Sequence, residues 1–313
     1  MLTLDQGGAT IGRRRLLRPP PDLLPFVELI SIERRTAPPL PGEEAWRIVP
    51  DGHGHLLYQA ADSADGGGTS QRLIAVGARS RPLDVDVRRR FLTVGIRLWP
   101  GALPALVDTT GAELVDRSVE LEALEGSWIL PLVGRLDEAR ERELHARARG
   151  HLRPDDRGTG ESFERALYEA VVELTRSLLV RRRRRAAWAT RRQRLSAAAA
   201  AIGSARVTSV ADLAALTGTP QRTLHQWARR DLGFGPKRWL AIHRLHRALD
   251  LALYGGHRGW ADVAAAAGFA DQSHLIRSAR ELLRETPSVY LARRRSHLPS
   301  PAETSKPAPP VSG

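Results

Sequence analysis

Apolar and small residues recur at helical spacing in the C-terminal third of the chain, and the same pattern occurs there twice. Residues 210–218 read VADLAALTG and residues 260–268 read WADVAAAAG, and each stretch ends at a glycine. Glycine adopts the left-handed conformation that a tight turn between helices requires, and alanines let two helices cross closely. With one residue inserted, the match continues as far as Pro236 and Pro287. The pattern predicts two helix-turn-helix units joined by a helix from 236 to about 254, whose apolar stripe both units share.

The N-terminal part has a different periodicity. Between about residues 24 and 108, short apolar segments are separated by Gly, Pro and Asp, which is the pattern of strands in a small barrel or sandwich. Three glycines at 66–68 fit a hairpin tip. Trp46, Tyr58 and Trp99 either line a ligand pocket or pack in the core of this region.

Helical spacing returns after the predicted strands. It extends from about 102 to 150, a polar loop follows at 151–160, and an amphipathic helix is expected from 162 to about 180. Its apolar stripe consists of Phe163, Ala166, Leu167, Ala170, Val171, Leu174 and Leu178. Such a stripe either packs on the chain's own β-rich region or forms a dimer seam.

The second of the two repeated units contains a longer string of specific residues. Residues 267–277 read AGFADQSHLIR, and TPSVY follows at 286–290. At these residues the chain resembles the AraC family of bacterial transcription regulators, and the likeness extends over about residues 205 to 292. Ala228 and Ala279 depart from the phenylalanine that the family usually carries at these places.

This resemblance implies an α+β fold with several parts. A β-rich, cupin-like or jelly-roll-like sensor domain is expected at 1–110, since many AraC-type regulators carry one, and a helical connector with the dimer contact at 111–185. The all-α double helix-turn-helix domain is expected at 186–295. A tail at 296–313, rich in Pro, Ser and Ala, is predicted to be disordered.

The second helix of each unit is predicted to read DNA, because that helix enters the major groove with its first turns against the base edges. Thr219 with Pro220 is the expected start of this helix in the first unit, and Asp271 is the expected cap in the second. The outward side chains that can reach DNA are Arg222, His225, Gln226, Gln272, Ser273, His274 and Arg277. Arginine pairs with guanine and glutamine with adenine, each worth about 1–3 kcal/mol of discrimination. For each side chain, contact with solvent or phosphate alone is the alternative.

Charge is unevenly distributed along the chain. Residues 181–295 contain 23 Lys and Arg against 7 Asp and Glu, whereas residues 1–180 contain 24 against 27. A polyanionic partner is expected for the basic part, because phosphate neutralisation with counterion release supplies most non-specific DNA affinity. The five arginines at 181–185 either contact phosphate or form a solvated linker.

Several classes of function find little support in the residues. The chain has no cysteine, which excludes disulfides, cysteine-bound zinc and the methyl-transferring DNA-repair proteins that need a reactive thiol. His53 and His55 form a two-histidine pattern that a cupin-type metal enzyme would use, but further ligands are not evident. Neither a signal peptide nor an apolar run of about 20 residues is present, so we expect a cytoplasmic protein without a membrane partner.

The sequence therefore predicts a DNA-binding transcription regulator of AraC type that is not an enzyme and needs no cofactor or metal. Its expected partners are double-stranded promoter DNA, a second copy of the chain in a homodimer, RNA polymerase and a small-molecule effector of unknown binding residues. A nucleoid-type binder without sequence preference is the first alternative, and a cupin-type metal enzyme fused to a DNA-binding domain is the second.

Overall fold

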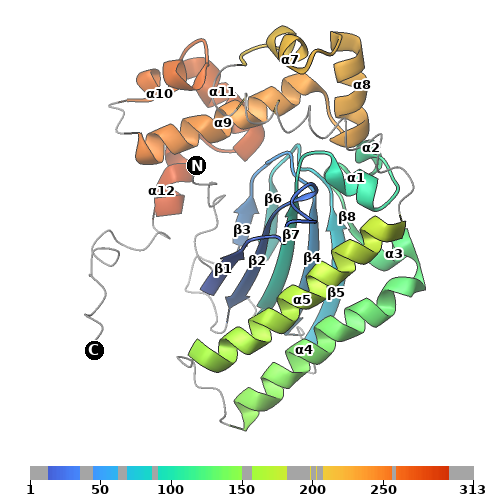
Figure 1. The fold of residues 1–313 in the computed structure, drawn as a ribbon. Helices are drawn as coiled ribbons and strands as arrows, with labels where there is room; N and C mark the ends of the chain where they lie inside the picture. Colours follow the sequence, from blue (N-terminus) through green and yellow to red (C-terminus); the bar gives the residue numbers. More distant parts are fainter. Residues whose placement is uncertain are drawn as a thin grey trace, which may run out of the picture.

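The computed structural model describes residues 13–35, 45–62, 69–86, 91–149, 157–181, 198, 202, 207–255 and 259–295. Two domains are visible in Figure 1, and we call them the front domain (residues 13–181) and the rear domain (residues 198–295). The glycine triplet at 66–68, the arginines from 182 to 194 and the tail at 296–313 lie outside the described residues.

The front domain contains a six-stranded antiparallel sheet in the order β1-β2-β7-β4-β5-β8 and a separate pair, β3-β6. The strands are β1 (Arg13–Leu17), β2 (Val27–Arg35), β3 (Ala45–Ile48), β4 (His55–Asp62), β5 (Thr69–Val76), β6 (Leu83–Asp86), β7 (Phe91–Leu98) and β8 (Ser118–Glu120). Side chains alternate between the two faces of a strand. Leu56, Tyr58 and Ala60 of β4 are accordingly buried on one face, while Leu57 and Gln59 between them are half-buried.

Helices cover the face of the sheet on which these buried side chains lie. The helical elements of the front domain are α1 (Ala102–Leu106), α2 (Gly111–Leu114), α3 (Leu121–Glu125), the 3-10 turn η1 (Ser127–Ile129), α4 (Leu130–Ala148) and α5 (Arg157–Arg181). The long helices α4 and α5 lie side by side across the sheet (Figure 1). One hydrophobic core extends from Leu23 to Leu179, so the expected β-rich and helical segments form a single unit around it.

The apolar stripe of α5 is part of that core. Leu167, Val171, Leu174 and Leu178 are each at most 1% exposed within the single chain. Of the two roles considered for the stripe, the structure therefore shows packing on the chain's own β-domain. These side chains are not available for a dimer seam.

The rear domain is all-helical and contains the two repeated units. Its helices are α7 (Val210–Thr217), α8 (Gln221–Asp231), α9 (Pro236–Tyr254), α10 (Trp260–Ala267), α11 (Gln272–Leu283) and α12 (Pro287–Arg295). Gly218 and Gly268 end α7 and α10 at φ 58° and 84°, as the turns require. On α9, Trp239, Ile242, Leu245 and Leu249 are buried in the core of the rear domain. The α+β architecture and the helical rear domain are confirmed.

The two domains are docked tightly together. Gly111 at the start of α2 lies directly against Gly233 after α8, where a Cβ atom on either glycine would overlap the other's backbone. Gly52 lies against the Trp239 indole, and His246 of α9 forms a 2.5 Å hydrogen bond with the Pro50 carbonyl. Val49 and Ala78 of the front domain belong to the buried core of the rear domain. The front-domain residues around Val49 to Gly52, Ala78 and Gly111 therefore pack directly against α8 and α9.

Candidate DNA-binding surface

The first unit begins with a reciprocal cap. The Ser209 hydroxyl accepts a hydrogen bond from the Asp212 amide at 3.0 Å, and the Asp212 carboxylate accepts one from the Ser209 amide at 2.9 Å. This capping box satisfies amides that have no partner within α7. Hydrogen bonds from the Thr208 amide and hydroxyl to the Asp212 carboxylate, together with those from Ser209, lower the pKa of Asp212, so its carboxylate stays ionised at neutral pH. The start of the first unit is fixed by residues that we had not singled out from the sequence.

The start of α8 differs from the prediction. Pro220, not Thr219, is the N-cap residue, and no side chain caps the helix. Thr219 is 4% exposed, and its hydroxyl donates to the Thr217 carbonyl at 3.1 Å. Since the hydroxyl faces back into the turn, it does not reach the first amides of α8. The prediction that Thr219 caps this helix is therefore wrong.

The start of α11 agrees with the prediction. The Asp271 carboxylate accepts a hydrogen bond from the His274 amide at 2.7 Å, which confirms Asp271 as the cap. The imidazole of His274 turns inward, since its Nδ1 accepts from the Ala270 amide at 3.4 Å and its ring lies edge-on to Phe269. His274 therefore helps to hold the turn, and its expected contact with DNA stays a prediction.

The other predicted DNA-contacting side chains are presented on the surface of the two second helices. Arg222, His225, Gln226, Gln272, Ser273 and Arg277 are all exposed, and the front domain covers none of them. Leu224 and Leu275 point the opposite way and are fully buried. Ala228 and Ala279 are also fully buried, so alanine packs in the core at the two places where the AraC family usually carries phenylalanine. Hydrogen-bonding groups of two kinds, guanidinium and carboxamide, thus face outward from both helices.

Two further arginines lie on the same surface. Arg229 and Arg280 are exposed, two turns or more beyond the helix starts, and the repeat pairs them with each other. Their position in the last turn of α8 and of α11 suits a phosphate contact, because base edges face the first turns. The repeat register was the signal in the sequence that would have found them.

The histidine pair at residues 53 and 55 is used within a buried ionic network. His53 lies 3.1 Å from the Glu28 carboxylate and His55 lies 3.2 Å from Asp51. Arg97 lies among them, with its Nε 2.9 Å from Glu28. Burial by itself would raise the pKa of Asp51. The hydrogen bond from His55 and the charges of Arg97 and His53 outweigh burial and hold the pKa of Asp51 below its usual range. Within the described part of the chain, no group of three or more His, Cys, Asp or Glu is arranged to hold a metal ion.

The aromatic side chains considered as pocket residues have structural roles where they are described. Tyr58 is 1% exposed, and its hydroxyl donates to Asp137 at 2.7 Å, a bond that with burial raises the pKa of the phenol. Trp99 is half-buried and donates to the Leu24 carbonyl at 2.9 Å. The side chain of Trp46 lies outside the described residues. Tyr58 is therefore a core residue.

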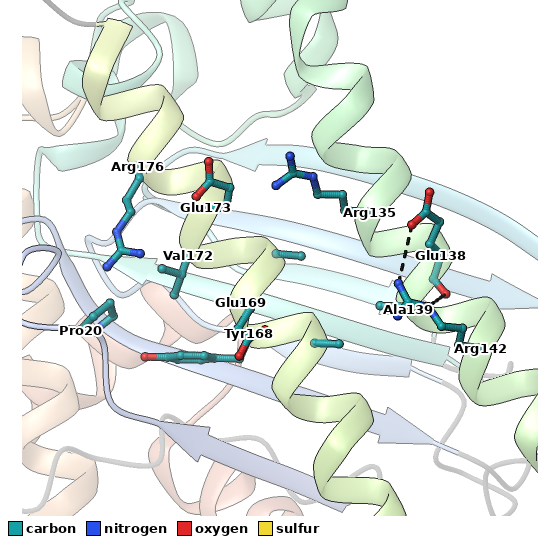
Figure 2. A pocket seen from close by; sticks show the side chains of 12 residues that line it. Pro20, Arg135, Glu138, Ala139, Arg142, Tyr168, Glu169, Val172, Glu173 and Arg176 are labelled. Atoms are coloured by element: carbon teal, nitrogen blue, oxygen red, sulfur yellow. Dashed lines mark hydrogen bonds and ion pairs between the residues drawn. The ribbon is translucent and has the colours of Figure 1, made fainter.

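A surface cavity of about 650 Å³ lies between α4 and α5, away from the rear domain. Figure 2 shows charged side chains of both signs around it, among them Arg135, Glu138 and Arg142 of α4 and Glu173 and Arg176 of α5. Alanines and Val172 also line it.

Among the described helices, none has both the length and the apolar content needed to span a membrane.

Comparison with known proteins finds a family model that matches in each part of the chain. Residues 213–293 match the family model of a helix-turn-helix domain, and residues 15–120 match a domain of unknown function, DUF6597. No curated protein matches the sequence.

Similar solved structures cover the rear domain or most of the chain. An AraC-type regulator from Chromobacterium violaceum is 24% identical over 34% of this chain and 96% of its own, with a TM-score of 0.31. The DNA-binding domain of AdpA, solved in complex with a target DNA, is 27% identical over 34% of this chain and 96% of its own, with a TM-score of 0.31. ToxT from Vibrio cholerae is 10% identical over 84% of this chain and 97% of its own, with a TM-score of 0.37. With the matched residues and the two glycine-ended turns in view, the chain carries an AraC-type helix-turn-helix domain at residues 213–293.

Proposed function

We propose that this protein is a sequence-specific transcription regulator whose α8 and α11 read neighbouring major grooves of one promoter site. The observation that carries the proposal is the paired set of exposed side chains on α8 and α11. Both helices pack against α9, and the front domain leaves these side chains uncovered. Recognition helices that bind one face of DNA lie one helical turn apart, roughly 34 Å. A bend in the site is the expected means of fitting both helices.

Sequence preference separates this proposal from a nucleoid-type binder. Arg277 and Gln226 occupy matching places in the two units and carry the donors that suit guanine and adenine. Arginine-rich composition alone would give phosphate binding without discrimination.

The test starts from duplexes that the full-length protein selects out of a random-sequence library. We expect one recurrent site with two boxes, and Arg277→Ala should reduce the preference for that site over random DNA by about 1–3 kcal/mol. Arg230→Ala removes an exposed charge from the other recognition helix. It should weaken binding to the selected site and to random DNA by a similar factor. Selection of no recurrent sequence would overturn the proposal. If Arg277→Ala lost equal affinity for the selected site and for random DNA, Arg277 would contact only the DNA phosphate backbone.

We also propose that the front domain is the regulatory part and that a small-molecule effector acts through its docking. It contacts both units: α2 meets the end of α8, and Arg47 donates to the Leu283 carbonyl at the end of α11 at 3.1 Å. A ligand that changes this docking would change the position of both recognition helices.

The finer expectations of a homodimer, of a contact with RNA polymerase and of a cytoplasmic location belong to the same proposal. Because the stripe of α5 is buried, a dimer seam would lie on the outer surface of α4 and α5 or elsewhere on the front domain. A dimer would present four recognition helices, and its operator would contain two similar half-sites. Sedimentation of the full-length protein at micromolar concentration tests the dimer directly.

A further inference from the structure

Two arginines of α9 donate hydrogen bonds to backbone carbonyls of the helix-turn-helix units. Arg244 Nη2 donates to the Thr208 carbonyl at 2.6 Å, directly before the cap of α7. Arg247 Nε donates to the Ala266 carbonyl at 3.0 Å, in the last turn of α10. α7 and α10 are the first helices of the two units, and a guanidinium of α9 bonds to a backbone carbonyl at the start of the first and at the end of the second.

Arg244 also lies where the two units meet. A Cβ atom on Gly268, in the turn of the second unit, would lie 3.9 Å from Arg244 Cδ and 3.9 Å from the Thr208 methyl group. The stem of Arg244 therefore passes the turn of the second unit before its guanidinium reaches the start of the first. One side chain of the shared helix connects both units.

The chemistry of both bonds indicates positioning. The Ala266 carbonyl belongs to the last turn of a helix, where carbonyls have no intrahelical partner and a cation is favourable. Arg244 is half-buried, and burial lowers the pKa of its guanidinium from the ordinary value. A charge held partly out of water, with its donor aimed at a carbonyl, is poorly placed for a mobile phosphate contact.

We propose that Arg244 and Arg247 are positioning residues that set the spacing and relative rotation of α8 and α11, and thereby the separation of the two DNA boxes that the protein accepts. The inference rests on the proposed function and deepens it. A change of one base pair in the separation rotates the second box by roughly 34–36° about the DNA axis. A rigid pair of units rejects that change, whereas a loosened pair tolerates it.

The test uses the duplex selected by the wild-type full-length protein, together with versions in which the two boxes are one base pair closer or farther apart. Fluorescence anisotropy gives the affinity for each duplex, and the spacing ratio is the affinity at the selected separation divided by that at the altered ones. We expect Arg244→Met and Arg247→Met each to lower this ratio by roughly 3- to 10-fold, which corresponds to the typical net contribution of one hydrogen bond. Binding to a duplex with a single box should change far less.

Two further variants separate positioning from charge. A lysine at 244 keeps the charge, but its side chain ends one bond short of Nη2, so Arg244→Lys should resemble Arg244→Met. Lys237→Met removes an exposed cation from the same helix and should leave the spacing ratio unchanged.

The outcomes distinguish the inference from the function on which it rests. A wild-type ratio in both methionine variants, or recovery of that ratio by Arg244→Lys, would overturn the positioning role while the function stands. If the wild-type protein selects no two-box site, the proposed function itself fails. Should Arg244→Met not fold, as judged by circular dichroism, Arg247→Met decides the question alone, with Lys237→Met as its control.

Discussion

At the scale of single residues, the caps of the two recognition helices show how far local chemistry can be read. Asp271 was predicted correctly because a carboxylate that caps a helix needs only an amide three residues away. Thr219 was predicted to cap by the same reasoning, yet the repeat register pairs Asp271 with Pro220. The Thr219 hydroxyl bonds back to the Thr217 carbonyl, and Pro220 occupies the capping position, so Thr219 cannot reach the first amides of α8.

Removal of the Asp271 cap should destabilise the rear domain. We expect Asp271→Ala to lower its free energy of unfolding by about 1 kcal/mol, because the His274 amide loses its acceptor. Asp271→Asn keeps an acceptor oxygen and should cost only a few tenths of a kcal/mol. Urea denaturation of the full-length protein measures both, and equal losses for the two variants would show that the cap is not the cause.

At the scale of elements, helix α5 shows why a pattern identifies an apolar face but not its partner. The spacing of Leu167, Val171, Leu174 and Leu178 predicts one stripe, and the structure confirms it. The same spacing suits a dimer seam and an internal core, since both remove the stripe from water. The choice depends on the sheet that α5 meets, which is assembled from strands far away in the chain.

Substitutions on α5 should therefore act on folding. We expect Leu174→Ala to lower the free energy of unfolding of the front domain by about 2–5 kcal/mol, because its side chain is 0% exposed and leaves a cavity. Val180→Ala on the same helix is the matched control, since Val180 is 77% exposed and should change stability by less than about 0.5 kcal/mol. A folded, equally stable Leu174→Glu protein that sediments as a monomer beside a dimeric wild type would contradict this and restore the seam.

At the scale of the whole molecule, the docking of the two domains brings ionisable groups together. His243 and His246 of α9 face Asp51, His53 and Arg97 of the front domain. Burial, reinforced by the nearby cationic groups, lowers the pKa of His243 to about 3 and lowers that of His246. Asp51 and Glu28 keep pKa values below their usual ranges, so they stay ionised through the mildly acidic range.

Docking should consequently weaken in acid. Both α9 histidines are neutral in the docked state and have ordinary pKa values near 6.5 when the domains separate. Their contribution to docking is thus complete above about pH 6.5 and is lost as the pH falls below that value, by up to about tenfold in the equilibrium per pH unit for His243 and in the same direction for His246. The chain has no cysteine, so Arg142→Cys and Arg230→Cys can carry a fluorescent pair across the two domains.

Energy transfer between these labels should fall between pH 7.5 and pH 5.5. The double variant His243→Gln and His246→Gln is the control, and its transfer should depend much less on pH because neither side chain titrates. Constant transfer in the protein with both histidines down to pH 5.5 would contradict the role of this cluster.

The sequence by itself determined the features that depend on neighbours along the chain. The glycine-ended turns, the Asp271 cap, the outward side chains of α8 and α11, and the stripes of α5 and α9 all follow from spacing within a helix, because backbone geometry fixes which residues share a face. The repeat and the excess of positive charge in residues 181–295 are also properties of the sequence alone, and they predict a DNA-binding region.

Only the tertiary structure decided what lies opposite each face. It placed the sheet under α5, enclosed His53 and His55 in a network with Arg97, and joined Gly111 to Gly233 across the two domains. It also gave Arg244 and Arg247 carbonyl partners in separate units. These contacts join residues that lie from 19 to more than a hundred positions apart. Nothing in the local pattern specifies them, because the partner of a side chain is set by how whole elements pack together.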